Sequence, residues 1–190
     1  MHRFLEELLF ASVGWVPTVV GMGLRLLLWR PFFGSCGRVR FGTGLAVLGC
    51  RNIRLGDGVR LARGVQLYAG DGRLEVGSGT SISPGVTVDA SSGEIRIGQK
   101  VAIGPGTVLR AANHRFDRTD VPIIEQGHTP GTIVVEDDVW IAANCTITPD
   151  VRLGHGSIIG AGAVVTHDVE PFCIVGGVPA RVIGRRVPEK

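Results

Sequence analysis

The sequence predicts an all-β protein whose short strands stack as a parallel β-helix, a triangular prism of coils. From Leu55 onward an aliphatic residue recurs at every sixth position, and the fourth residue after each of them is small or β-branched. A period this short is typical of a parallel β-helix in which each hexad gives one strand and one turn. Extra residues interrupt the sixfold spacing only after every third hexad, so three hexads make one coil. The aliphatic positions are Leu55, Leu61, Leu67, Val76, Ile82, Val88, Ile97, Ile103, Leu109, Val135, Ile141, Ile147, Leu153, Ile159 and Val165.

These insertions all lie at one corner of the predicted prism. They follow Leu67, Val88 and Leu109, each one coil after the last, and the third insertion is a long loop at residues 110–132. Because coils stack in register, the insertions lie along one edge, and solenoids often carry function on the face where insertions gather. We therefore expect any chemistry to lie along this edge.

Composition favours one compact domain and excludes a nucleic-acid partner. Among the 190 residues are 29 glycines, which suit the tight turns of such a coil. The net charge of +3 is small, and no run of Lys and Arg is interleaved with aromatics, so nucleic-acid binding is not expected. The four cysteines form no CxxC pair and indicate free thiols in a reducing, cytoplasmic compartment.

The N-terminal segment, residues 1–33, lies outside the repeat and predicts two short helices at about 2–14 and 18–29. It is nearly uncharged but interrupted by Gly and Pro, which makes it marginal for a membrane span of about 20 apolar residues. We favour peripheral contact with the inner face of the cytoplasmic membrane, because the segment is more apolar than a cap with one wet face requires. The alternative is a cap on the open end of the solenoid. The residues expected at the membrane surface are Trp15, Trp29, Arg25, Arg30, Arg38 and Arg40.

Several motifs resemble the hexapeptide-repeat acyltransferases. The loop reads RAANHRFD from Arg110, a later stretch reads VWIAANC from Val139, and the closing segments lie at 159–166 and 176–183. The resemblance covers about residues 39–184 and is nearest to the O-acetyltransferases of bacterial surface polysaccharides and simple sugars. It implies a left-handed β-helix over 34–184, followed by a short basic tail at 185–190. It also implies a homotrimer that holds acetyl-CoA between neighbouring subunits.

The same resemblance implies roles for individual residues. His114 matches the general base of the family, and the backbone N–H of Ala143 would stabilise the oxyanion. Asp89 lies at the same corner one coil earlier, where it either orients His114 or only holds a turn. His167 departs from the family, which often has Lys there. The residues expected at the acetyl-CoA cofactor are Trp140, Ala142, Gly160, Ala161, Thr166 and Arg181.

The acceptor is expected to contact the long loop. Its side chains are polar and charged, which suggests recognition of a polar or anionic sugar, and a lipid-linked glycan becomes the natural acceptor if the N-terminal segment touches a membrane. The residues expected to bind the acceptor are Arg110, Asn113, Arg115, Asp117 and His128.

The sequence thus predicts an acetyl-CoA-dependent O-acetyltransferase that acts on a sugar hydroxyl of a bacterial surface polysaccharide or its lipid-linked precursor. A metal-dependent hydratase of the carbonic anhydrase type also uses this architecture, but it needs a pair of histidines a few residues apart, which this chain lacks, so no metal is expected. Two alternatives stay open. One is transfer to another small hydroxyl or amine acceptor, and the other is a non-catalytic structural subunit.

Overall fold

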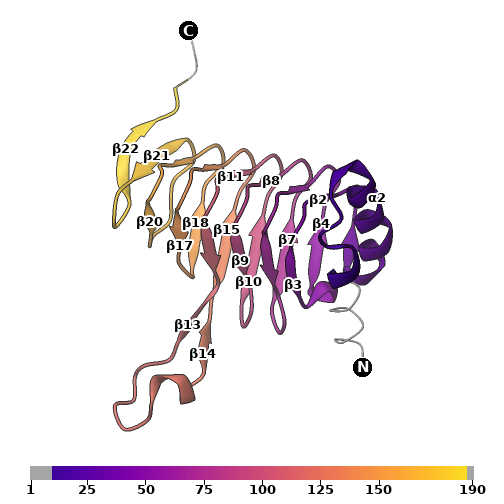
Figure 1. The fold of residues 1–190 in the computed structure, drawn as a ribbon. Helices are drawn as coiled ribbons and strands as arrows, with labels where there is room; N and C mark the ends of the chain where they lie inside the picture. Colours follow the sequence, from indigo (N-terminus) through magenta and orange to yellow (C-terminus); the bar gives the residue numbers. More distant parts are fainter. Residues whose placement is uncertain (1–9, 188–190) are drawn as a thin grey trace.

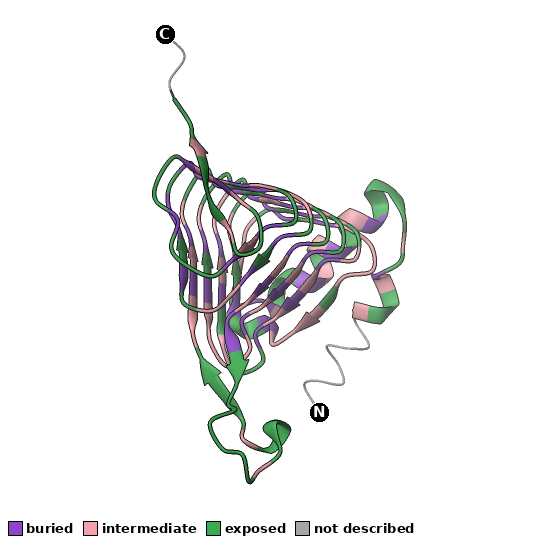
Figure 2. Ribbon diagram, turned by 90° about the vertical axis from the view of Figure 1, so that its left-hand side faces the viewer, coloured by how far each residue is buried: buried purple, intermediate pink, exposed green. Residues whose placement is uncertain are grey.

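The computed structural model describes residues 10–187, which form an elongated prism of stacked coils (Figure 1). Its faces are three sheets, here named A, B and C, and Figure 2 shows the triangular cross-section that they enclose. The predicted fold class, a parallel β-helix, is confirmed. Sheet A contains β1 (Ser35–Cys36), β4 (Ile53–Leu55), β7 (Arg73–Val76), β10 (Glu94–Ile97), β15 (Thr132–Val135) and β18 (Val151–Leu153).

Sheets B and C complete each coil. Sheet B contains β2 (Arg40–Phe41), β5 (Arg60–Leu61), β8 (Ser81–Ile82), β11 (Ala102–Ile103), β16 (Trp140–Ile141), β19 (Ile158–Ile159), β21 (Cys173–Gly176) and β22 (Arg181–Arg185). Sheet C contains β3 (Ala46–Leu48), β6 (Gln66–Tyr68), β9 (Thr87–Asp89), β12 (Val108–Arg110), β17 (Thr146–Ile147) and β20 (Val164–Val165). The chain therefore runs from A to B to C in every coil, and the insertions lie at the corner between C and A.

The sixfold period becomes columns of aliphatic side chains inside the prism. Leu55 pairs with Val76, and the column continues through Ile97, Val135 and Leu153, all of which are buried. Each side chain of this size contributes roughly 1.5 to 3 kcal/mol when fully buried. In-register stacking thus stabilises the same contact in every coil.

Two threonines occupy inward small positions and bond successive coils to each other. The Thr80 hydroxyl donates to Gly98 O at 2.8 Å and accepts the Val101 N–H at 3.1 Å. The Thr107 hydroxyl donates to Ala142 O at 2.9 Å and accepts the Cys145 N–H at 3.2 Å. Both side chains are completely buried, so these bonds meet the requirement that buried polar groups find partners.

The N-terminal helix α2 (Thr18–Trp29) covers the first coil of the prism (Figure 1). Its Trp29 is buried and packs edge-on against Phe41 of β2, while Phe10 and Phe33 join the same ring cluster. A cap on the solenoid, the alternative weighed from the sequence, is thus what this helix forms. No helix within residues 10–187 has the length and apolar content needed to cross a membrane.

The burial of Trp29 and Arg25 corrects two expectations from the sequence. Trp29 was expected at the membrane interface but is completely buried. Arg25 was expected near lipid headgroups, but only 1% of its surface is exposed. Its guanidinium donates to Phe41 O at 2.9 Å, to Val13 O at 3.1 Å and to Val16 O at 2.7 Å. The expectation was wrong because three backbone carbonyls replace the water around this cation and bind α2 to the first coil.

The opposite face of α2 remains apolar and exposed. Gly21, Arg25 and Trp29 are the buried positions of the helix, which contains no other charged residue. The large side chains on its outer side, together with the turn before it, are Trp15, Val19, Val20, Leu24 and Leu27, with exposed fractions between 37% and 73%. We call this set the α2 outer face.

The insertion at 110–132 forms a hairpin that projects away from the prism at the corner between sheets C and A (Figures 1 and 2). Its strands are β13 (Ala112–His114) and β14 (His128–Pro130), which pair antiparallel. Gln126 organises the tip, since its side-chain amide donates to Arg118 O at 2.7 Å and to Val121 O at 2.8 Å. The tip exposes three large apolar side chains, Phe116, Ile123 and Ile124.

Candidate active site

The hairpin brings two histidines together. His114 on β13 is the cross-strand partner of His128 on β14, and the centroids of the two rings lie 4.3 Å apart at an interplanar angle of 37°. The Arg115 N–H donates to Gly127 O at 3.0 Å just beyond the pair and fixes its register. Both histidines are exposed. A ligand that reaches one imidazole from solvent therefore meets the other.

Asp89 has partners other than His114. Its Oδ2 atom accepts from the guanidinium of Arg110, the adjacent residue across sheet C, and its Oδ1 atom accepts the Ser91 N–H at 3.0 Å. The structure shows no hydrogen bond between Asp89 and His114 among the described residues. Asp89 thus contacts the turn and the base of the hairpin, and its role in orienting His114 stays a prediction.

A different carboxylate lies near the pair. Asp71, in the first insertion, accepts the Ser92 N–H at 2.7 Å and the Ser92 hydroxyl at 2.9 Å. These hydrogen bonds, and to a smaller degree the charge of His128, hold the pKa of Asp71 below its ordinary value. Asp71 was not among the site residues predicted from the sequence, although its position in a stacked insertion was a usable signal.

The remaining loop residues expected at the acceptor are open to solvent. Asn113, Arg115 and Asp117 are exposed, and their side chains form no hydrogen bond or ion pair within residues 10–187. Arg110 is the exception, because its guanidinium is held by Asp89. The hairpin thus offers unpaired polar groups around His114.

Ala143 lies at a different corner, between sheets B and C. The N–H groups on both sides of it are used, since Ala142 donates to Ile159 O at 2.9 Å and Asn144 donates to Pro105 O at 2.8 Å. The Ala143 N–H donates to no acceptor in the described part of the chain. A backbone donor without an internal partner can bind a developing negative charge.

Gly160 stacks on Ala142 in the next coil, and most of the residues expected at the cofactor lie near it. A Cβ atom on Gly160 would lie 3.1 Å from Val175 O, so the backbone here is close to that of the next coil. Ala161 is exposed beside it. Trp140 leads into the same corner from sheet B and is 53% exposed.

Arg181 lies near this group of residues, whereas Thr166 does not. Arg181 opens β22, opposite Gly176, and the only hydrogen bond of its side chain among the described residues is to the adjacent Ala180 O at 2.8 Å. Thr166 lies beyond β20 toward the corner between sheets C and A, where its hydroxyl is 2.9 Å from His167 Nδ1. The exposed guanidinium of Arg181 is thus available to an anionic ligand.

A single chain therefore does not assemble the predicted site. His114 projects from the corner between C and A, whereas Ala143, Gly160 and Ala161 lie at the corner between B and C. The strands of sheet C and their turns separate the two corners. The described residues also contain no group of three or more His, Cys, Asp or Glu side chains suited to a metal ion.

Comparison with known proteins identifies the repeat. Residues 132–167 match the family model described as bacterial transferase hexapeptide (six repeats). A chloramphenicol acetyltransferase from Escherichia coli is 47% identical over 60 residues, which cover 32% of this chain and 29% of that relative. The chain spans less than two thirds of the length of the curated relatives it matches, from 21% to 54%.

Solved structures extend the similarity to the whole prism. A hexapeptide-repeat acetyltransferase from Vibrio cholerae, complexed with acetyl coenzyme A, is 26% identical with a TM-score of 0.64, covering 96% of this chain and 86% of that chain. The polySia-specific acetyltransferase NeuO is 28% identical with a TM-score of 0.63, covering 77% of this chain and 68% of that chain. The resemblance to hexapeptide-repeat transferases stated from the motifs is confirmed.

Proposed function

We propose that this chain, which is built from the hexapeptide repeats of bacterial transferases, moves an acetyl group from acetyl-CoA to a hydroxyl group of a sugar. The observation that carries the proposal is the exposed His114, held on the one long insertion of an otherwise regular solenoid. The similar Vibrio cholerae structure holds acetyl-CoA, which supports this donor. A purely structural subunit would not need an imidazole presented in this way.

His114 is proposed as the general base. Its imidazole would take the proton from the acceptor hydroxyl as that oxygen bonds to the carbonyl carbon of the thioester. The carbon–sulfur bond then breaks, and His114 returns the proton to the sulfur of the departing CoA. The donor supplies an activated acyl group, so the chain itself has to provide only a base, a donor for the carbonyl oxygen and alignment.

Ala143 is proposed to supply that donor. Its N–H has no acceptor within the described chain, so it can bind the carbonyl oxygen as negative charge develops there. Gly160 and Ala161 would let the pantetheine arm lie against the backbone, with Trp140 and Ala142 along the groove wall. Thr166 lies at the other corner of the same prism, so its hydroxyl would meet the arm from a neighbouring subunit. Arg181 would bind the phosphates of CoA.

A second copy of the chain is proposed to complete the site, in a homotrimer. His114 and Ala143 lie at different corners of one prism, so the base of one subunit would meet the oxyanion donor of its neighbour. The exposed Phe116, Ile123 and Ile124 at the hairpin tip support this arrangement, because a projecting apolar tip is stabilised when another subunit covers it.

The acceptor is proposed to be a sugar of a bacterial surface polysaccharide or of its lipid-linked precursor. The unpaired Asn113, Arg115 and Asp117 around His114 suit a polar ligand, and His128 would contact the acceptor at the ring of His114. The likeness to a polySia-specific acetyltransferase supports a glycan acceptor. The likeness to chloramphenicol acetyltransferases favours a second candidate, a small diffusible alcohol.

Peripheral membrane contact is proposed for the α2 outer face. The helix turns its one cation inward and presents large apolar side chains outward, while Arg30, Arg38 and Arg40 are exposed. This combination suits a surface of anionic lipid at the cytoplasmic side of the membrane. Because α2 also caps the prism, its removal would uncover Phe41, so the cap and the membrane contact belong to the same element.

The central test is acetyl transfer with purified full-length protein. Acetyl-CoA would be mixed with simple sugars, sugar nucleotides and small alcohols, and the released thiol and the acetylated product would be measured. Transfer to a sugar hydroxyl is the expected result. Thiol release with no preference for sugars over small alcohols would support the second candidate, and binding of acetyl-CoA without any transfer would refute catalysis.

A further inference from the structure

A small polar pocket lies where the early strands β4 and β7 of sheet A begin, outside the site described above. Its volume is about 200 Å³, and its lining includes three arginines and an asparagine. Asn52 is fixed, because its side-chain amide donates to Ala69 O at 2.8 Å and to Gly70 O at 3.2 Å. The lining residues are Arg51, Asn52, Arg54, Gly72 and Arg73.

The arginines of this pocket are only partly neutralised by carboxylates. Arg54 and Arg73 share a single carboxylate oxygen, Glu75 Oε1, at 3.2 Å and 2.5 Å. Glu94 lies 4.0 Å from Arg73 but bonds chiefly to Arg96 at 2.7 Å. Arg51 forms no ion pair or side-chain hydrogen bond within residues 10–187. Asp71, the nearby acid, directs both of its oxygens to Ser92.

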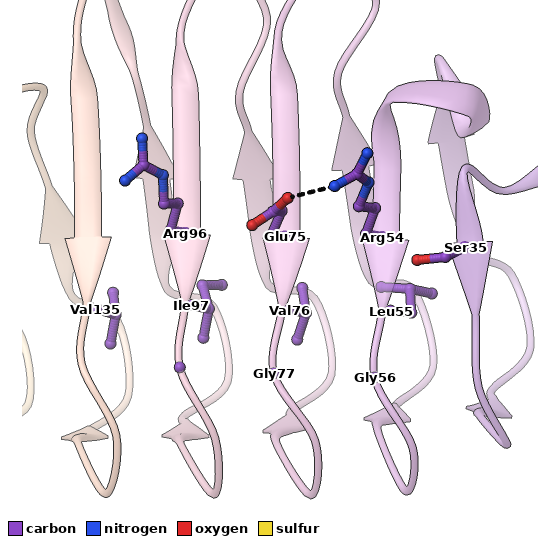
Figure 3. A pocket seen from close by; sticks show the side chains of 11 residues that line it. Ser35, Arg54, Leu55, Gly56, Glu75, Val76, Gly77, Arg96, Ile97 and Val135 are labelled. Carbon is purple, nitrogen blue, oxygen red and sulfur yellow. Dashed lines mark hydrogen bonds and ion pairs between the residues drawn. The ribbon is translucent and has the colours of Figure 1, made fainter.

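A second depression adjoins the pocket and shares Arg54 with it. It has a volume of about 410 Å³ and extends along the same sheet to Arg96 (Figure 3). In Figure 3, Arg54 and Arg96 flank Glu75, and the Arg96 guanidinium has no partner among the residues drawn. The linings of the two depressions contain four arginines and one glutamate, Glu75, while Glu94 outside the linings pairs with Arg96. The hollow therefore has an excess of positive charge.

The pocket lies on the same side of the prism as the histidine hairpin. Arg73 is the register partner of Glu94, and Glu94 is the partner of Thr132, the first residue of the strand that follows the hairpin. Two strand spacings of about 4.8 Å therefore separate Arg73 from that strand, about 10 Å in all. One extended ligand can reach both places.

We propose that this pocket binds a phosphate group of the acceptor, so that the acceptor is a phosphorylated or diphosphate-linked sugar. Guanidinium groups arriving from three positions match a group with several acceptor oxygens, whereas a lone carboxylate is satisfied by one arginine. The phosphate would lie against Arg51 and Arg73 while the sugar extends along the corner toward His114. This inference rests on the proposed acetyl transfer and specifies its acceptor.

The test compares three acceptors that contain the same sugar and differ only in the group attached to it. They are the free sugar, the sugar on a nucleoside diphosphate and the sugar on a short-chain polyprenyl diphosphate. Arg51→Ala should raise the acceptor KM for both phosphorylated forms about tenfold or more, the loss expected for a charge-assisted hydrogen bond. Its KM for the free sugar and for acetyl-CoA should not change. Arg51→Lys should restore part of the loss.

Arg152→Ala is the matched control, since Arg152 lies on the same sheet but is paired with Glu136 beyond the pocket. It should leave all three acceptors unaffected. The nucleotide and lipid arms distinguish the two sources of phosphate by their relative kcat/KM. Equal effects of Arg51→Ala on all three acceptors, or no effect on any, would overturn the proposal.

A binding measurement keeps the phosphate site separate from catalysis. Inorganic pyrophosphate would be titrated into the full-length wild type, Arg51→Ala and Arg152→Ala by calorimetry. Loss of pyrophosphate binding in Arg51→Ala alone would support the phosphate site, whether or not the protein transfers acetyl groups. Failure of the wild type to acetylate any of the acceptors would refute the proposed activity and leave this binding result standing. Identical binding by all three proteins would refute the phosphate site.

Discussion

His114 is the single residue on which the proposed chemistry most depends. Its replacement, His114→Ala, should lower kcat by about 10²- to 10⁴-fold, the usual range for loss of a general base, while the affinity for CoA stays unchanged. His128→Ala should mainly raise the acceptor KM, because His128 contacts the ring of His114 without being the base. Steady-state rates at saturating substrates measure both effects.

A third histidine provides the control for these variants. His155 packs against Phe172, with ring centroids 5.3 Å apart, far along the chain from the hairpin. His155→Ala should retain the wild-type rate. Near-full activity of His114→Ala in the same assay would show that the base lies elsewhere.

Arg181 tests the cofactor end of the site. Its guanidinium would bind phosphate oxygens remote from the reacting carbonyl, so Arg181→Ala should raise the KM for acetyl-CoA while kcat stays nearly constant. The variant should also discriminate less between CoA and its 3′-dephospho form. A fall in kcat with an unchanged donor KM would contradict this placement.

At the scale of elements, α2 has two faces with different duties. The double substitution Val20→Asp and Leu27→Asp places charge on the exposed side only, where both residues are at least 65% exposed. Binding to vesicles of anionic lipid should be lost in a flotation assay, while the melting temperature should change little, because neither side chain packs on the prism.

The buried side of α2 supplies the contrast. Trp29→Ala should lower stability by about 3 to 5 kcal/mol, since it removes a fully buried indole, yet it should leave the outer face intact. If the double Asp variant bound vesicles as well as the wild type, the α2 outer face would not be a membrane contact, and α2 would serve only as a cap. Deletion of residues 1–33 cannot separate the two duties, because it removes both faces.

At the scale of the whole molecule, a site shared between subunits predicts complementation. A His114→Ala chain retains an intact Ala143 corner, and an Arg181→Ala chain retains an intact hairpin. Mixed trimers of the two should contain some sites in which both parts are wild type. Co-expressed chains assayed at low acetyl-CoA should therefore be more active than either variant alone. Activity no greater than the average of the two would indicate that each chain builds its own site.

Acid should lower the folding stability of the protein by protonating two glutamates on the outer face of sheet A. Hydrogen bonding to Arg96 lowers the pKa of Glu94, and the His155 N–H, followed by Arg152, lowers the pKa of Glu136, both from an ordinary value of 4.5. A depressed pKa means that the stabilisation is complete above pH 4.5 and is lost as the pH falls through the lower folded-state pKa. Melting temperatures measured from pH 7 to pH 3 should therefore fall below about pH 4.5.

Glu136→Gln tests the origin of that acid sensitivity. This variant should be less stable than the wild type at neutral pH and should lose less on acidification. If the melting temperature of Glu136→Gln fell as steeply as that of the wild type between pH 4.5 and pH 3, the acid sensitivity would belong to other groups.

The prism was predictable because its signal is repeated. Each aliphatic position recurs in every coil, so Leu55 and Leu153 belong to one column that a single period reveals. Arg25 has no such repeat, and its burial depends on three carbonyl groups that only the folded chain brings together. The pairing of His114 with His128 was likewise hidden, because the hairpin interrupts the period and sets its own register.

The two ends of the prism explain why such a stack of strands stops. A row of parallel strands with open ends is a template for endless fibre growth, since each exposed edge can pair with another chain. Here α2 obstructs the first coil, and β22 runs antiparallel to β21 and reverses the direction of sheet B at the last. End-to-end strand pairing with a further copy is thus obstructed at the first coil and, on sheet B, at the last coil. In the proposed homotrimer the prisms would meet along their sides, a closed arrangement that leaves no free end for filament growth.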